Sequence, residues 1–365
     1  MMRLIFRPSR IKSYQNIFFM VEQVYNFSLD VTWQLIQRMS SLDRFDAQWT
    51  TIEKREGQSL KQLKSIATVR SVGASTRIEG SKMTNEEVES LLNNLKMSKL
   101  EERDQQEVVG YFEVLDLIGE VYEDIHITES DIKNLHNMLL KHSEKDAWHK
   151  GDYKQVSNSV EATLPDGTKQ IIFQTTEPGF PTEEAMRNLI DWYNQYDDIH
   201  PLVRCAAFVY EFVSIHPFQD GNGRMSRLLS TLLLLKNGYK WIQYVSFEHE
   251  IESRKAEYYR ALRTCQANRP QENLSVWVEF FLDALSNIQV QLMKKMETQS
   301  SRNKLSARAK AILLYIENHP DCRSGDIAKG LNIPSSSVKR ILSDLFDQHL
   351  IQRLGEESHP FYEIV

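Results

Sequence analysis

The residues best suited to chemistry lie in one run of twelve, His216–Arg227, which reads HPFQDGNGRMSR. His216 titrates near neutral pH and can accept a proton from an incoming hydroxyl group. Arg224 and Arg227 are three residues apart, so their cationic groups share one face of a helix. Asp220 lies just before them, and a carboxylate beside phosphates is typical of a bridging Mg²⁺ ion. The run predicts a site where a phosphate-bearing molecule and a metal ion meet a proton acceptor.

The residues between these side chains also favour an anion. Gly221 and Gly223 have no side chains, so the backbone can adopt positive φ and approach a ligand closely. The run leads into a helix, and the free N–H groups at a helix N-terminus attract anions. Two arginines there oppose the helix dipole at about 0.3–1 kcal/mol each, a cost that a bound polyphosphate would offset. Asn222 can hold a phosphate oxygen or fix the loop.

Two apolar helices are expected to hold this loop. Residues Leu202–Val213 form a helix with a buried character, and Pro217 disfavours helical backbone at His216, which ends that helix. A second apolar helix covers Met225–Lys236 and stops at Gly238. The sequence contains neither the GxxxxGK[ST] nor the GxGxxG pattern, so the loop is not one of those phosphate-binding loops.

Most of the remaining chain is predicted to be helical. The helix before Gly80 is followed at once by a capping box, Thr84 to Glu87, and Thr182 is the expected N-cap of a later helix. The apolar spacing predicts amphipathic helices over Ser59–Glu79, Gln105–Val121, Ser130–Lys141 and Thr182–Tyr193. Residues Tyr153–Pro178 are rich in β-formers around a Pro-Asp-Gly turn, which predicts a β-hairpin lying against the helices.

Composition limits the class of protein. The chain has 365 residues, 41% hydrophobic and 26% charged, which indicates an ordinary globular protein of two or three domains. The net charge of −6 excludes a strongly basic nucleic-acid coat. The three cysteines, at 205, 265 and 322, are odd in number and widely spaced, which favours reduced thiols. With no apolar run long enough for a bilayer, we expect a soluble, cytoplasmic protein without membrane contact.

The C-terminal part is predicted to be a separate domain. A polar stretch, Met293–Lys304, is interpreted as a linker. Three short helices and two strands follow, in the order of a winged helix-turn-helix, with residues 335–340 opening the recognition helix. From Leu305 onward seven basic residues face eight acidic ones, a net charge of −1, which is poor for DNA affinity. Protein interaction and DNA binding both remain open for this domain.

The run His216–Arg227 resembles the HxFx[D/E]GNGRxxR signature of Fic-domain proteins at every defined position. The resemblance extends from about residue 30 to 290 and implies a mainly α, Fic-type helical bundle with a β-hairpin flap, followed by the winged helix. The expected organisation is an arm over 1–27, a helical region with an inhibitory helix over 28–130, a catalytic core over 131–295, a linker over 296–304 and the winged helix over 305–365.

The resemblance implies a nucleotidyltransferase that moves AMP from ATP to a Ser, Thr or Tyr hydroxyl of a protein, with Mg²⁺. His216 would be the general base and Asp220 the metal ligand. Residues 221–223 (Gly221, Asn222 and Gly223) would form the anion hole, and Arg224 and Arg227 would hold the outer phosphates.

A second motif supports this reading. Residues 75–80, STRIEG, are similar to the family's inhibitory pattern [S/T]xxxE[G/N]. Glu79, with Ser75 at the start of the motif, would then pair with Arg227 and occupy the cation meant for the γ-phosphate. ATP would bind in an unproductive pose, with its α-phosphorus misaligned for in-line attack.

The resemblance also gives the hairpin a role. A target protein would dock its backbone on the flap, residues 153–178, as an extra strand, and Asn158–Val160 would line the nucleotide. Tyr258 and Tyr259 match a tyrosine pair near the nucleoside, or are core aromatics of an amphipathic helix. Lys154 stands where the family often has Arg, so the bidentate geometry of a guanidinium is lost.

Two alternatives remain open. Besides the AMP transferase, the first is an ATP-sensing regulator that binds DNA or protein without transferase activity. The second is an enzyme that uses Glu79 to orient a water and remove AMP, or that transfers another phosphate-containing group. Self-modification is compatible with a transferase, and oligomer formation with every reading.

Overall fold

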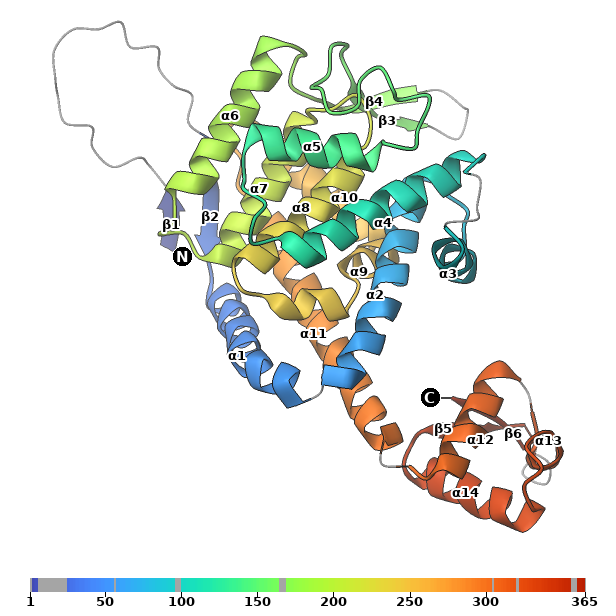
Figure 1. Cartoon of the computed structure of the whole chain (residues 1–365). Coiled ribbons are helices and arrows are strands. Elements are labelled where there is room, and N and C mark those ends of the chain that lie inside the picture. Colours follow the sequence, from blue (N-terminus) through green and yellow to red (C-terminus); the bar gives the residue numbers. More distant parts are fainter. Residues whose placement is uncertain are drawn as a thin grey trace, which may run out of the picture. The chain divides into compact units, whose positions relative to one another are not determined.

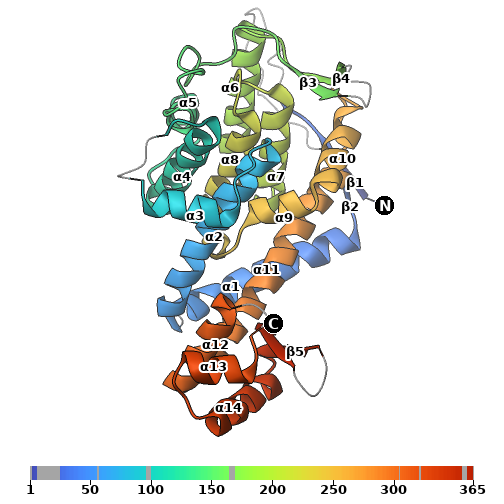
Figure 2. The ribbon, with the colours of Figure 1, turned by 90° about the vertical axis from the view of Figure 1, so that its right-hand side faces the viewer.

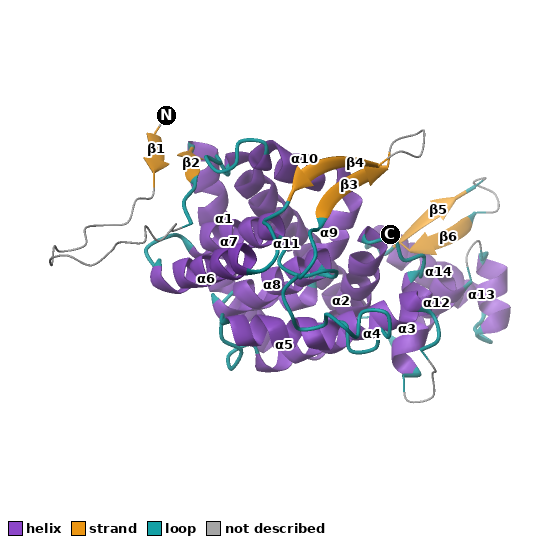
Figure 3. Ribbon diagram, turned by 90° about the horizontal axis from the view of Figure 1, so that it is seen from above, coloured by secondary structure: helices purple, strands orange, loops and turns teal. Residues whose placement is uncertain are grey.

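The computed structural model describes residues 2–5, 25–55, 57–95, 100–163, 169–303, 305–319, 322–355 and 360–364. Within these residues the chain divides into a larger unit, Met1–Gln291, and a C-terminal unit, Leu292–Val365. Helices dominate both units, and the described strands form three separate two-stranded antiparallel sheets (Figure 3). None of the described helices is long and apolar enough to cross a membrane.

The larger unit is a helical bundle with a small hairpin (Figure 1). The elements are β1 (Met2–Ile5), β2 (Ser28–Val31), α1 (Trp33–Arg55), α2 (Gly57–Ile78), α3 (Asn85–Asn93), α4 (Arg103–Val121), α5 (Glu129–Leu139), β3 (Ser159–Thr163), β4 (Lys169–Gln174), α6 (Phe180–Gln195), α7 (Pro201–Ile215), α8 (Asn222–Lys236), the 3-10 helix η1 (Lys240–Tyr244), α9 (Phe247–Ser253), α10 (Lys255–Gln266) and α11 (Ser275–Asn303), which runs on into the C-terminal unit.

The two apolar helices predicted around the loop are α7 and α8, and they form the centre of the bundle. Almost every residue of both is buried, as expected for helices that are apolar on all sides. In Figure 1 they lie side by side, with α2, α4, α5, α6 and α10 around them. The short connection between them, residues 216–221, is therefore held at both ends by buried helices.

The end of α2 has the predicted form. The helix stops after Ile78, and Gly80 has φ of 109°, a backbone conformation that glycine adopts without strain. Thr84 and Glu87 form a capping box at the start of α3, with both reciprocal hydrogen bonds present. The segment 79–84 is thus a defined turn that fixes where the last residues of α2 lie.

The N-cap predicted at Thr182 is wrong. Helix α6 begins earlier, at Phe180, with Gly179 as its N-cap and Pro181 in its first turn. Proline is well suited to that turn because its missing N–H needs no partner there. Thr182 lies inside the helix, where its hydroxyl donates to the carbonyl of Glu177 at 2.6 Å.

The hairpin predicted within 153–178 is present as the antiparallel strands β3 and β4. Ser159 pairs with Gln174 at one end and Thr163 with Lys169 at the other. Its Pro-Asp-Gly turn lies outside the described residues. Figure 2 and Figure 3 both place the hairpin beside α10. Phe173 of β4 and Tyr259 of α10 line the same cavity, so the hairpin and α10 share one side of it.

The C-terminal unit contains three helices followed by a two-stranded sheet: α12 (Ala307–Asn318), α13 (Ser324–Gly330), α14 (Ser335–Asp347), β5 (Ile351–Leu354) and β6 (Phe361–Ile364). Its core is formed by apolar residues of all five elements. This is the predicted order of elements, and its interpretation as a winged helix stays a prediction. The residues predicted as a linker, 296–304, are helical up to Asn303. Ile288, Leu292 and Met296 continue the apolar spacing, and the residues between them are good helix formers.

The three cysteines, at 205, 265 and 322, are all buried.

Candidate active site

The loop between α7 and α8 is closed by the side chain of Asn222. Its Oδ1 accepts the N–H of Phe218 at 2.9 Å, and its Nδ2 donates to the carbonyl of Phe218 at 2.7 Å. Of the two roles proposed for Asn222, this geometry is that of fixing the loop. His216 ends α7 with φ of 54°, a left-handed conformation rather than the extended one expected before proline. Such strain in a residue other than glycine is typical of functional sites.

The hydrogen bond of His216 defines which ring nitrogen is free. Nδ1 lies 3.3 Å from the carbonyl of Val213 and donates to it in the neutral ring, which leaves the lone pair on Nε2. Burial lowers the pKa of His216 to about 4, against a smaller opposing effect of the hydrogen bond to Val213. The ring is therefore neutral at pH 7, as a proton acceptor must be.

The loop opens into a cavity of about 400 Å³. Most residues predicted for the site line it together, although they come from distant parts of the sequence: the turn after α2, the α7–α8 loop with the start of α8, and α10. They are Glu79, His216, Asp220, Gly221, Asn222, Gly223, Arg224, Arg227, Tyr258 and Tyr259. The volume falls within the usual range for a small-molecule site.

The Nε and Nη2 groups of Arg227 are engaged by Ser75, near the end of α2, and by Glu79 in the turn after it. Its Nε donates to the hydroxyl of Ser75 at 2.8 Å, and Nη2 donates to the Ser75 carbonyl at 3.0 Å and to Oε1 of Glu79 at 2.7 Å. Arg227 and Ser75 are buried, whereas the Glu79 side chain keeps 33% of its surface exposed. Since the guanidinium would otherwise be buried without a counter-charge, these contacts satisfy a cation that needs an anion.

Glu79 is ionised in this position. Burial favours its neutral form, but the charge and hydrogen bond of Arg227 outweigh burial, so the pKa of Glu79 lies below its ordinary value. The carboxylate also rests directly on Gly223, where a Cβ atom would come 2.2 Å from Oε1. A side chain at 223 would therefore force the Glu79 carboxylate to shift from this position.

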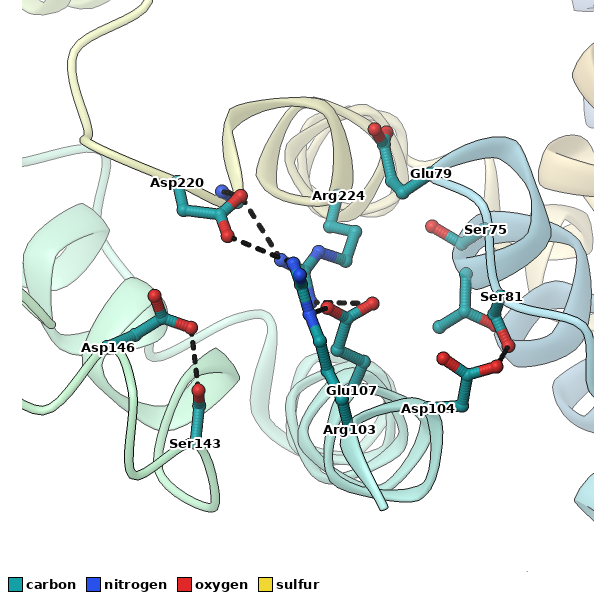
Figure 4. A network of polar contacts seen from close by, with 12 residues as sticks. Ser75, Glu79, Ser81, Arg103, Asp104, Glu107, Ser143, Asp146, Asp220 and Arg224 are labelled. Carbon is teal, nitrogen blue, oxygen red and sulfur yellow. Dashed lines mark hydrogen bonds and ion pairs between the residues drawn. The ribbon is translucent and has the colours of Figure 1, made fainter.

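Arg224 lies between two carboxylates (Figure 4). Its Nη2 is 3.5 Å from Oδ1 of Asp220, and its Nη1 is 3.5 Å from Oε2 of Glu107 on α4. Within the described residues, Nε and Nη1 of Arg224 are buried without a hydrogen bond. Buried donors of this kind are costly unless a ligand pairs with them, so Arg224 is poised to receive an anion.

Asp220 faces cations on two sides. Besides Arg224, Nη2 of Arg103 lies 3.5 Å from its Oδ2, and its Oδ1 accepts the N–H of Gly221 at 2.6 Å. Burial acts to raise the pKa of Asp220, but Arg224, the Gly221 amide and Arg103 together hold it below the ordinary value. The side chain is 37% exposed, so one carboxylate is available to a ligand in the cavity.

This donor set fits Mg²⁺ in one specific way. Among the described residues, no three His, Cys, Asp or Glu side chains gather into a metal site. Mg²⁺ is commonly bound by one or two carboxylates together with substrate phosphates and waters. Asp220 beside two arginines fits that arrangement, in which the nucleotide itself supplies most of the ligands.

The tyrosine pair lies between the cavity and the core, and its predicted contact with a nucleoside stays a prediction. Tyr258 and Tyr259 line the cavity and contact each other edge to face at 5.1 Å. Tyr258 also packs against Trp277 and Phe280 of α11, at 5.6 and 5.9 Å. Val160 is in strand β3, but its side chain lies outside the described part of the chain.

Two side chains that sequence reasoning missed hold the loop. His136 of α5 is fully buried and stacks on Phe218 at 3.7 Å. Its Nδ1 accepts the N–H of Gly151 at 3.0 Å, so its Nε2 carries the proton and donates to the carbonyl of Asp220 at 2.9 Å. Glu107 pairs with Arg103 and Arg224. No pattern in the sequence links either residue to the loop, because the partners there are backbone atoms for His136 and the distant Arg224 for Glu107.

The model of the Fic/DOC family matches residues 126–234, which include α5, the hairpin, α7 and most of α8. Residues 126–234 form a Fic domain. The expected mainly α, Fic-type bundle with a hairpin is confirmed by solved structures. A Fic family protein from Desulfovibrio desulfuricans aligns over 92% of this chain and 97% of its own, with a TM-score of 0.60 and 24% identity. A Fic domain containing signaling protein from Bacteroides thetaiotaomicron aligns over 72% of this chain and 95% of its own, with a TM-score of 0.55 and 25% identity.

The Fic domain is also found in similar curated proteins. The protein adenylyltransferase Fic of Drosophila mojavensis is 26% identical over 281 residues, which cover 74% of this chain and 52% of that protein. The protein of the same name in Drosophila willistoni is 30% identical over 207 residues, 56% of this chain and 39% of that protein. The chain therefore spans about half, or less, of the length of these relatives.

Proposed function

We propose that the chain is a protein adenylyltransferase whose nucleotide site is inhibited by its own helix α2. The observation that carries the proposal is the 2.7 Å contact between Glu79 and Arg227 inside the cavity that contains His216. A transferase site explains the buried arginines, the neutral histidine and the strained loop together. The name shared by the curated relatives supports the same activity.

The reaction would use the groups already in place. Nε2 of His216 takes the proton of a Ser, Thr or Tyr hydroxyl as its oxygen attacks the α-phosphorus of ATP. The new oxygen–phosphorus bond forms as the bond to the β-phosphate breaks, and pyrophosphate leaves. Arg224 and Arg227 hold the outer phosphates, and the backbone of residues 221–223 contacts the phosphate oxygens. Mg²⁺ held by Asp220 would neutralise charge on the leaving pyrophosphate.

Glu79 inhibits this reaction by occupying Arg227. A charge-assisted contact to a phosphate contributes about 1.5–3 kcal/mol, and Arg227 cannot make it while its Nη2 is bonded to Glu79. ATP would then bind through fewer phosphate contacts, with its α-phosphorus displaced from in-line geometry. The target protein docks on the β3–β4 hairpin as an added strand.

Intact-mass measurement after incubation with ATP and Mg²⁺ tests this function. Glu79→Gly is expected to attach AMP to itself or to added cell protein, which is read as an increase in intact mass. The wild type is expected to attach much less. Glu79→Gly with His216→Ala is expected to attach none. Equal modification of all three proteins would contradict the assigned roles. If a modified protein loses AMP and this loss requires Glu79, the result would instead favour the de-AMPylating alternative.

A further inference from the structure

Lys154 is a buried cation that the proposed reaction leaves unused. Its side chain has no exposed surface, and its Nζ donates to Oδ1 of Asn158 at 2.9 Å, to Oγ1 of Thr175 at 3.0 Å and to the carbonyl of Ile215 at 3.1 Å. An ammonium group has three donors, and here each one has an acceptor. A buried charge paired this completely has a defined structural task.

The three acceptors belong to two different parts of the site. Asn158 comes just before strand β3 and Thr175 just after β4, so together they form the base of the hairpin. Ile215 is the last residue of α7 and directly precedes His216. The ammonium of Lys154 therefore joins the base of the hairpin to the backbone that carries the candidate base.

Backbone contacts strengthen the same connection. The N–H of Lys154 donates to the carbonyl of Pro217 at 2.8 Å, and Nδ2 of Asn158 donates to the carbonyl of Phe218 at 2.8 Å. The hydroxyl of Thr175 also contacts the carbonyl of Asn158. The loop is thus tied to the hairpin on both sides of His216.

We propose that Lys154 is a positioning residue that couples the β3–β4 hairpin to His216, so that the surface for the target polypeptide and the orientation of the imidazole depend on one ammonium group. The role assigned to Lys154 rests on the proposed function. The contacts that join the hairpin to the loop do not depend on it. An arginine at this position would present its donors in a planar fork, whereas Lys154 directs three from a single nitrogen.

The charge of Lys154 also acts on His216. After burial and the Val213 hydrogen bond, Lys154 is the next influence on the pKa of His216, and it lowers that pKa, whereas Glu79 and Asp220 raise it. Burial lowers the pKa of Lys154 itself to about 8, with Glu177 opposing. At pH 7 the group is therefore a cation with all three donors.

Hydrogen exchange of the full chain without nucleotide tests the coupling. Lys154→Met keeps the aliphatic stem and removes the ammonium, and Lys141→Met, an exposed lysine of the same domain, is the control. We expect roughly tenfold faster exchange both in the hairpin (159–163 and 169–174) and in residues 216–221, and no change in the control. Faster exchange in only one segment, or in neither, would overturn the proposal.

Two further measurements keep the test decisive. If Lys154→Met does not fold, Thr175→Val removes one acceptor, and unchanged exchange in 216–221 would then count against the coupling. Where Lys154→Met folds, nuclear magnetic resonance of His216 is expected to show its pKa above about 4, because a neighbouring cation is gone; an unchanged pKa contradicts the proposal. Neither readout needs transferase activity, so a failure of the proposed function is distinguishable from a failure of this inference.

Discussion

Glu79 and Arg227 are 148 residues apart in the chain, yet Oε1 of the first lies 2.7 Å from Nη2 of the second. The contact is not isolated, because Ser75, one helical turn before Glu79, binds the same guanidinium through its hydroxyl and its carbonyl. Three oxygens, two from Ser75 of α2 and one from Glu79 in the turn that follows, therefore contact a cation of α8. An anionic ligand that takes the Nη2 group of Arg227 must displace the carboxylate of Glu79.

The close fit of Glu79 on Gly223 gives a prediction about stability. Gly223→Ala places a Cβ 2.2 Å from Oε1 of Glu79, and we expect a loss of about 1–3 kcal/mol in the free energy of unfolding, typical of overpacking. In the Glu79→Gly background the same substitution meets no carboxylate, so most of the loss should disappear. Denaturant unfolding of the four proteins measures this; equal losses in both backgrounds would show that the two residues do not touch.

Contacts from α9 and α10 hold the end of α2, just before Glu79. Arg77 makes two hydrogen bonds to Glu252, at 2.7 and 3.0 Å, and Lys255 donates to the carbonyl of Ile78 at 2.7 Å. Arg77→Met should loosen the end of α2 and raise modification by ATP above the wild type, though less than Glu79→Gly does. Lys61→Met, on the exposed face of the same helix, is the control. Wild-type levels of modification in Arg77→Met would mean that these contacts do not hold Glu79.

The lowered pKa of His216 predicts an unusual pH profile. The base must be neutral, so kcat/KM rises as pH rises through the pKa of the free enzyme, and the acid limb should lie near pH 4 rather than near 6.5. In the Glu79→Gly variant the limb moves lower still, because the charge of Glu79 raises the pKa of His216. Rates of AMP transfer between pH 3.5 and 8 check this, and a limb near 6.5 would show that the imidazole is solvated.

His136 should matter for the loop rather than for chemistry. His136→Phe keeps the stack on Phe218 but leaves the Gly151 N–H and the Asp220 carbonyl without partners, which costs about 1–3 kcal/mol in the free energy of unfolding. We also expect His136→Phe to bind ATP more weakly in the presence of Mg²⁺, since the backbone carbonyl of Asp220 loses its hydrogen bond. Calorimetry with and without Mg²⁺ measures this affinity. An equal loss of affinity under both conditions would show that His136 does not act through Asp220.

The sequence was informative where the site is contiguous. His216–Arg227 lies in one loop and one helix turn, so residue type and spacing indicated a phosphate site before any fold was known. The end of α2 was also predictable, because Gly80 and the capping box are local signals. The pairing of Glu79 with Arg227 was expected only through the resemblance to the Fic family, since no local rule relates the two positions.

Other features depend on tertiary contacts that leave no local pattern. His136 binds two backbone atoms, and backbone atoms carry no sequence signal. Lys154 was noticed only as a departure from the usual arginine, because its acceptors at Asn158, Thr175 and Ile215 meet only in the folded chain. At Thr182 a favourable N-cap residue was overridden by Gly179 and Pro181, which begin the helix earlier.

The most direct measurement compares the binding of ATP and ADP, with Mg²⁺, to the wild type and to Glu79→Gln. Glutamine keeps the shape of Glu79 without its charge, and Glu89→Gln on exposed α3 controls for net charge. The account predicts that the wild type binds the two nucleotides alike, because Arg227 is occupied, and that Glu79→Gln prefers ATP by about tenfold or more, as one charge-assisted phosphate contact implies. The same preference for ATP in both proteins would contradict competition between Glu79 and the γ-phosphate.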